Sequence, residues 1–177
     1  MSELFDQIVS MRGSFENLLA RIPGFRGYID KATRRTSDRM LRDHISAELT
    51  ARINRMASLE VELLENGGLS HMSATRSAKE KLQTFRDRVK AAAPGYSGFM
   101  EAVKVDSEAL ERLYAFDEAQ IRYASQIDEL LNNLEAAISS GDGVAEAVRA
   151  LDGLAREANE AFSLREDVLT NLSKSLE

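Results

Sequence analysis

The 177-residue chain contains no cysteine and no tryptophan, and only two of its residues are proline. The absence of cysteine excludes disulfides, thiolate metal ligands and a cysteine nucleophile, and it fits a reducing compartment. Aromatic residues make up only 6% of the sequence. A core in this chain must therefore be built mainly from aliphatic side chains. The abundance of Ala, Leu, Glu and Arg favours helices.

Long apolar runs are missing as well. No segment approaches the roughly 20 apolar residues that a helix needs to span a bilayer. The N-terminus lacks an uninterrupted apolar stretch behind a basic start, so it does not have the pattern of a signal peptide. These absences predict a cytoplasmic protein.

Histidine is nearly absent, which limits the chemistry that can be predicted. Neither His44 nor His71 has a carboxylate at the spacing that carboxylate-bridged di-iron bundles use. Carboxylates three residues apart could share a helix face, but a solvated acidic face gives the same pattern. No nucleophile-elbow or phosphate-loop motif occurs. We therefore predict no catalytic residue, no metal site and no cofactor. The paired carboxylates are Glu62/Glu65, Glu108/Glu111 and Glu157/Glu160.

The dominant signal is helical periodicity of apolar residues. It predicts helices over 2–22, 28–66, 73–92, 107–139 and 143–174, with the second one interrupted near Thr36 and Ser37. Short Gly-containing connections predict that neighbouring helices run antiparallel. The predicted fold is all-α: a single domain of long antiparallel hairpins (28–92 and 107–174, joined by a turn at 93–106) forming an elongated helical bundle or coiled coil.

The N-terminal segment 2–22 has apolar residues at alternating spacings of four and three, the pattern of a heptad seam. Its polar face lacks the basic excess of membrane-surface helices, so packing against helices is the favoured interpretation and membrane binding the alternative. Gly13 lies inside the segment and should weaken the helix only slightly. The seam residues are Leu4, Ile8, Met11, Phe15, Leu18 and Ile22.

A six-residue turn motif occurs twice, 71 residues apart, as Pro-Gly-aromatic-x-Gly-aromatic. Its glycines can adopt positive φ, and its aromatic residues can wedge between helices. We therefore interpret both copies as structural corners. Their defining residues are Pro23, Gly24 and Gly27 in the first copy, and Pro94, Gly95 and Gly98 in the second.

Several stretches carry a resemblance to a protein family. Pro-Gly-Phe-Arg-Gly-Tyr at 23–28, Asp-Arg-Met-Leu-Arg at 38–42, Gly-Tyr-Ser-Gly-Phe at 95–99, Ala-Val-Lys-Val-Asp at 102–106 and Leu-Tyr-Ala-Phe-Asp at 113–117 resemble an uncharacterised family of short helix-rich bacterial proteins. Together with their surroundings these blocks cover about half of the chain. The resemblance implies an all-helical bacterial protein and carries no activity or catalytic residue.

Charge is distributed unevenly along the chain. Residues 1–90 carry a net +4 and residues 91–177 a net −10, within a total of −6. This difference could join two halves of one molecule or pair separate copies. Arg35, Arg39 and Arg42 share one helical face, and their guanidinium groups suit phosphates or carboxylates. Interleaved aspartates neutralise much of that face, so nucleic-acid binding is not favoured.

These features predict a non-enzymatic helical interaction or scaffolding protein. Its heptad seams would mediate self-association, as a homo-oligomer, or bind the helices of a protein partner. The alternatives are an anion- or nucleic-acid-binding bundle that uses the arginine face, and a peripheral membrane protein anchored by 2–22.

Overall fold

The computed structural model of the chain describes residues 2–92 and 107–174, with side chains as far as residue 171. Every regular element in these ranges is helical, which confirms the all-α prediction. In the same ranges, no helix is both long and apolar enough to cross a bilayer. The elements are α1 (Glu3–Val9), α2 (Ser14–Arg21), α3 (Lys31–Glu65), the 3-10 turn η1 (Leu69–His71), α4 (Met72–Ala91), α6 (Ser107–Ser140) and α7 (Val144–Lys174).

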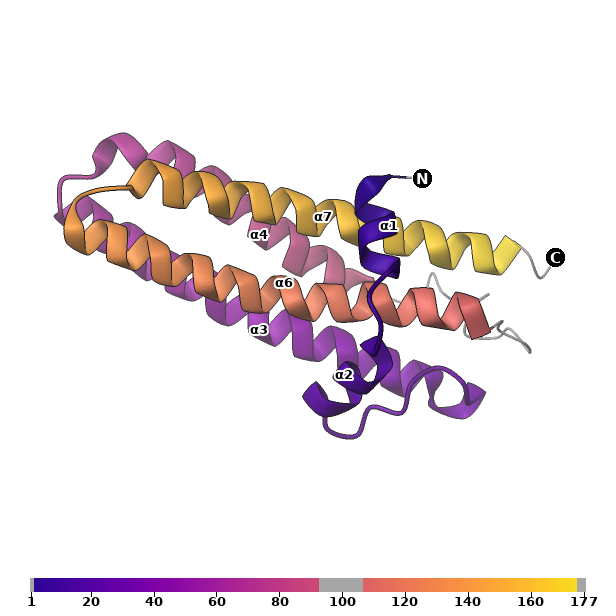
Figure 1. Cartoon of the computed structure of the whole chain (residues 1–177). Helices are drawn as coiled ribbons and strands as arrows, with labels where there is room; N and C mark the ends of the chain where they lie inside the picture. The colour runs from indigo at the N-terminus through magenta and orange to yellow at the C-terminus, as the bar shows by residue number, and fades with distance from the viewer. Residues whose placement is uncertain (1, 93–106, 175–177) are drawn as a thin grey trace.

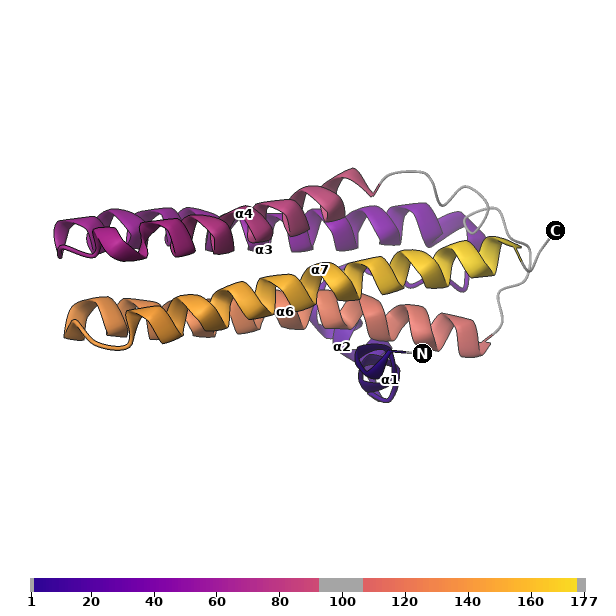
Figure 2. The ribbon, with the colours of Figure 1, turned by 90° about the horizontal axis from the view of Figure 1, so that it is seen from above.

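Four long helices form an elongated bundle (Figure 1). The hairpins α3–α4 and α6–α7 both turn at the same end of the bundle, as Figure 2 shows. The two hairpins lie against each other, with α3 on α6 and α4 on α7. At about 1.5 Å per residue, the 35 residues of α3 extend roughly 50 Å. The predicted hairpins and their elongation are therefore confirmed, and α3 continues through Thr36 and Ser37 without interruption.

The apolar seams of the long helices are buried inside this one chain. Leu41, Ile45 and Leu49 of α3 are at most 1% exposed. The seam of α4 and that of α7 face the same core. Four helices of one chain are therefore enough to cover these seams. The buried α4 and α7 seam residues are Ala78, Leu82, Phe85, Val89, Val144, Val148, Leu151, Ala155, Ala158 and Phe162.

The N-terminal segment 2–22 is not the single helix that its periodicity predicted. It forms α1 and α2, separated at 10–13. Gly13 has φ +76° and occupies the N-cap position of α2, a left-handed conformation that glycine adopts most readily. Ser2 caps α1 by accepting a hydrogen bond from the Phe5 N–H. Because the chain bends at Gly13, the two short helices can follow the curved surface of the bundle.

The charge difference between the two halves operates within one molecule. Arg55 of α3 pairs with Asp128 at 3.1 Å and with Glu135 at 2.6 Å, both on α6. Arg88 of α4 pairs with Glu166 of α7 at 2.9 Å, and its guanidinium lies 4.7 Å from the Phe162 ring centroid. Basic side chains of the first hairpin therefore hold acidic side chains of the second.

Helices α1 and α2 lie across α6 near its N-terminal end, and α1 also touches α7 (Figure 1). As a result, every residue of 113–121 is buried, on all sides of the helix. A helix covered all round needs apolar residues on all faces or internally paired polar ones. Asp117, Glu118 and Gln120 are the polar residues in this stretch, so each of them needs a partner inside the fold.

Candidate functional site

The first Pro-Gly turn anchors the site. The Phe25 N–H donates to Ile22 O at 3.1 Å, and Gly24, at the third position of this turn, has φ +83°, which matches a type II turn with proline at its second position. Gly27 also has positive φ, +76°. The aromatic side chains of Phe25 and Tyr28 are buried. The interpretation of this copy as a wedged corner is thus confirmed, whereas Pro94, Gly95 and Gly98 lie outside the described residues.

Tyr28 and Tyr114 join this corner to α6. Their rings stack with centroids 5.3 Å apart and an interplanar angle of 10°. The Tyr28 N–H donates to the Tyr114 hydroxyl at 2.8 Å. Gly27 allows this approach, because a β-carbon there would lie 2.5 Å from the Tyr114 hydroxyl oxygen and 2.7 Å from Phe15 Cε2.

A buried network of charged side chains lies behind the tyrosines. The Tyr28 hydroxyl donates to Asp117 Oδ2 at 2.6 Å, and Arg165 Nε of α7 donates to Asp117 Oδ1. Arg165 also lies 3.6 Å from Asp38 of α3, whose other oxygen accepts from Arg42 at 2.8 Å. The network therefore connects the corner with α3, α6 and α7.

Burial governs the acid-base behaviour of this network. Desolvation raises the pKa of the Tyr28 hydroxyl well above its ordinary value, and the nearby Asp117 carboxylate adds to the effect. Desolvation also raises the pKa of Asp117, although Arg165 and the Tyr28 hydroxyl oppose it. Burial likewise raises the pKa of Tyr114. Tyr28 thus stays a protonated donor. The groups are engaged with one another inside the fold, so we assign the network a structural role.

Sequence reasoning missed this network. In the sequence, Arg165 interrupts the apolar spacing of the last helix, and Asp117 ends one of the resembling blocks. The signal that could have found them is an arginine at a position that the apolar periodicity places inside the bundle, because a buried arginine requires a carboxylate partner. The arginine and its partners are far apart in sequence, so periodicity alone does not pair them.

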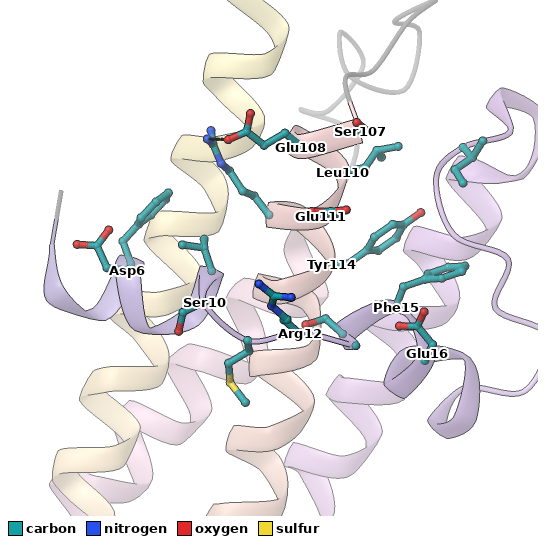
Figure 3. A pocket seen from close by; sticks show the side chains of 17 residues that line it. Asp6, Ser10, Arg12, Phe15, Glu16, Ser107, Glu108, Leu110, Glu111 and Tyr114 are labelled. Atoms are coloured by element: carbon teal, nitrogen blue, oxygen red, sulfur yellow. Dashed lines mark hydrogen bonds and ion pairs between the residues drawn. The ribbon is translucent and has the colours of Figure 1, made fainter.

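A wide cleft of about 1050 Å³ opens on the outer side of Tyr114 (Figure 3). Its walls are α1, the 10–13 connection, the start of α2 and the first two turns of α6. Phe5, Phe15 and Tyr114 supply aromatic surface, and the rings of Phe15 and Tyr114 are 4.8 Å apart. The cleft is therefore part apolar and continuous with the aromatic corner.

The charges around the cleft are mostly negative. Asp6, Glu16 and Glu111 are exposed at it and make no ion pair with any residue that the structure describes. Glu108 is paired with Arg112. Arg12 is exposed at the same cleft, so the six charged lining residues have a net charge of −2. The potential of the cleft favours cationic groups.

One buried polar group lines the cleft without a partner. Ser14, the first residue of α2, is 7% exposed, and its hydroxyl has no hydrogen-bond partner among the residues that the structure describes. Such a group ordinarily finds a protein or ligand partner, since leaving it unsatisfied costs about 1–3 kcal/mol. The Ser14 hydroxyl oxygen is shielded from solvent, so it belongs to the interior of the wall and not to the open surface of the cleft.

A smaller groove of about 390 Å³ lies on the other side of α1, between α6 and α7. Phe5 and Arg112 line both depressions, so α1 stands between them. Leu164 and Val168 of α7 give the groove an apolar floor, with Asp167 and Asn171 at its polar edge. The two depressions together surround α1.

The predicted N-terminal seam residues divide between core and cleft. Ile8 and Leu18 are buried, and Leu4 is half-buried against the core. Phe15 is half-buried in the cleft wall, and Met11, 43% exposed, lies at the cleft. A single seam facing a partner helix is therefore not formed; only Phe15 and Met11 are placed where a partner could reach them.

The arginine face is also divided. Arg35 and Arg39 are exposed on α3, whereas Arg42 is half-buried and bound to Asp38. Neighbouring Arg34 is buried, with its guanidinium donating to the Tyr28 and Ile29 carbonyls. The three predicted residues therefore do not act as one surface.

Comparisons with known proteins add nothing to this geometry: no model of a protein family, no curated protein and no solved structure matched the chain.

Proposed function

We propose that this chain is a non-enzymatic interaction protein of the bacterial cytoplasm that binds a segment of another protein in the α1–α2–α6 cleft. The bundle serves as a rigid support, and α1 and α2 shape the binding surface. The bacterial assignment rests on the family resemblance, and the cytoplasmic one on the composition.

One observation carries this proposal: a cleft of about 1050 Å³ lined by aromatic side chains and by carboxylates that have no partner among the described residues. Its volume is at the upper limit of ordinary small-molecule pockets, about 300–1000 Å³, and its walls are open rather than enclosing. An extended or helical segment suits such a shape. The seams of the long helices are buried in their own core, which leaves the cleft as the better candidate for a partner than the seams.

Site-specific photo-crosslinking in the source organism tests the proposal. A benzophenone amino acid is placed at Met11, at the cleft, and separately at Val61, on α3 near the hairpin end. Both positions carry exposed apolar side chains, 43% and 57% respectively. The proposal expects a defined crosslinked partner from position 11 and none from position 61.

The identified partner is then purified and its affinity measured against matched variants. Met11→Trp, which narrows the cleft, should weaken binding at least tenfold, and Val61→Trp should leave it unchanged. Equal crosslinking from the two positions, or equal binding by the two variants, would contradict the proposal. A crosslink to a second copy of this chain would replace it with self-association.

A further inference from the structure

We propose that the occupant of the cleft is a basic segment of a partner protein, with lysine or arginine side chains flanking a large apolar residue. This inference rests on the proposed function, and it specifies the chemistry that the cleft selects. Two independent properties of the cleft lead to it: the sign of its charge and the position of its aromatic surface.

The positions of the carboxylates indicate that the bound segment is positively charged. Asp6 comes from α1, Glu16 from α2 and Glu111 from α6 (Figure 3). They therefore come from three elements around the opening, and none makes an ion pair with a described residue. Like charges gathered around one opening repel one another, and a cationic segment relieves that repulsion. An acidic segment would have only Arg12 as an unpaired cation at the cleft among the described residues.

The aromatic surface of the cleft indicates that the bound segment also carries a large apolar side chain. Phe5, Phe15 and Tyr114 line the same cleft as the carboxylates. Met11 and Ile29, which are 43% and 70% exposed, add aliphatic surface. A large side chain of the segment can bury itself there, and aromatic rings also attract lysine and arginine by cation–π contact. A small polyamine would use the charge but leave this apolar surface uncovered.

The backbone of α2 provides a further contact. The first N–H groups of a helix have no intrahelical acceptor, and Gly13 caps α2 without a side-chain hydrogen bond. A main-chain carbonyl of the bound segment can accept from these donors. A peptide provides such carbonyls, whereas a simple cation does not.

Fluorescence anisotropy with designed peptides on the full chain tests the inference. The first probe is a short labelled peptide of leucine, phenylalanine and lysine; the second replaces every lysine by glutamate, and the third by glutamine. We expect the lysine peptide to bind and the other two to bind at least tenfold more weakly. Competition by spermine should be weak, because it lacks the apolar part.

A matched pair of triple variants distinguishes the effect of the carboxylates at the cleft from the effect of the net charge of the whole chain. Asp6→Asn/Glu16→Gln/Glu111→Gln should weaken binding of the lysine peptide roughly tenfold, since it removes three exposed carboxylates, each of which can form a modest ion pair with a lysine. Asp43→Asn/Glu65→Gln/Glu80→Gln makes the same change in net charge at exposed residues elsewhere and should have no comparable effect. Arg12→Ala should tighten binding about twofold, the opposite of what an anionic ligand would show.

The outcomes distinguish this inference from the proposed function. If the glutamate peptide binds best and Met11→Trp abolishes that binding, the basic class is wrong and the cleft remains a protein-binding site. If the two triple variants weaken the lysine peptide equally, or spermine displaces it fully, the inference is overturned. If no peptide binds while crosslinking at position 11 still yields a partner, only the basic class fails.

Discussion

Gly27 stands where two aromatic side chains leave no room for a β-carbon. At φ +76°, an L-residue other than glycine loses about 1–2 kcal/mol, and overpacking against Tyr114 and Phe15 adds about 1–3 kcal/mol. We therefore expect Gly27→Ala to lower the free energy of unfolding by about 2–5 kcal/mol. Urea denaturation measures it. Gly67→Ala is the control, because its φ is +80° but nothing lies within 4 Å of the added carbon. An equal loss in both variants would contradict the packing argument.

The Tyr28 hydroxyl satisfies Asp117 in a site from which water is excluded. Tyr28→Phe leaves Asp117 Oδ2 without this donor, so we expect a loss of about 1–3 kcal/mol in the free energy of unfolding at neutral pH. Because the pKa of folded Tyr28 is raised, its contribution is complete below the ordinary tyrosine pKa of about 10 and declines as pH rises above it. The difference between wild type and variant should therefore shrink in alkaline urea titrations. A constant difference would mean that Tyr28 titrates normally.

Residue-level prediction from sequence succeeded where the cause is local. Positive φ at Gly24 and Gly27 follows from a turn motif that can be recognised within six residues. The pairing of Arg165 with Asp117 depends on how α7 rotates against α6, and 48 residues separate the two. Such a contact is fixed by packing, so the sequence marks the charged residue without identifying its partner.

At the scale of elements, Gly13 shows where periodicity fails. The four-three spacing of apolar residues continues from Leu4 to Ile22 across the break, because α1 and α2 both turn their apolar sides to the same bundle. Periodicity therefore reports which side is covered and not whether the backbone is continuous. The long helices were predicted closely, since each has a seam of five or more positions and glycines follow the ends of α3 and α6.

The contact between α4 and α7 includes an ion pair that we expect to be sensitive to acid. Lys81 donates to Asp152, which also accepts from Arg156 at 2.8 Å. The hydrogen bond from Lys81 is the main cause that lowers the pKa of Asp152. A lowered pKa in the folded state means that the stabilisation is present above the ordinary pKa of about 3.9 and is lost as pH falls through the folded value.

Asp152→Asn should therefore be less stable than wild type by about 0.5–1 kcal/mol at neutral pH, a modest value because the pair is partly exposed. This difference in stability should disappear in acid, where the Asp152 carboxylate of the wild type is protonated and therefore neutral like asparagine. Thermal unfolding followed by circular dichroism at a series of pH values measures it. Asp142→Asn, at an exposed connection, should show no gap at any pH. A gap that persists at low pH would show that shape rather than charge matters at position 152.

For the whole molecule, the sequence predicted the architecture and left the site undefined. Apolar seams and the glycines between them predict the long hairpins. The charge difference between the two halves of the chain agrees with the ion pairs that join the two hairpins. The cleft depends on the path of α1 and α2 over α6, which is a tertiary property. Of the predicted interaction residues, only Phe15 and Met11 line it, because the others cover the core or lie on α3.

The arrangement of seams and charges predicts the solution state. Since the seams of the long helices face one core and the basic side chains of one hairpin pair with the acidic ones of the other, we expect a monomer of 19.6 kDa at low and at high salt. Size-exclusion chromatography with light scattering measures this. High salt should lower the free energy of unfolding slightly, because it screens the partly exposed pairs, without changing the mass. Leu151→Asp places a carboxylate where the leucine is fully buried, so it should unfold the chain and not dissociate an assembly. A stable multiple of the chain mass that Leu151→Asp converts to a helical monomer would mean that the seams serve two chains.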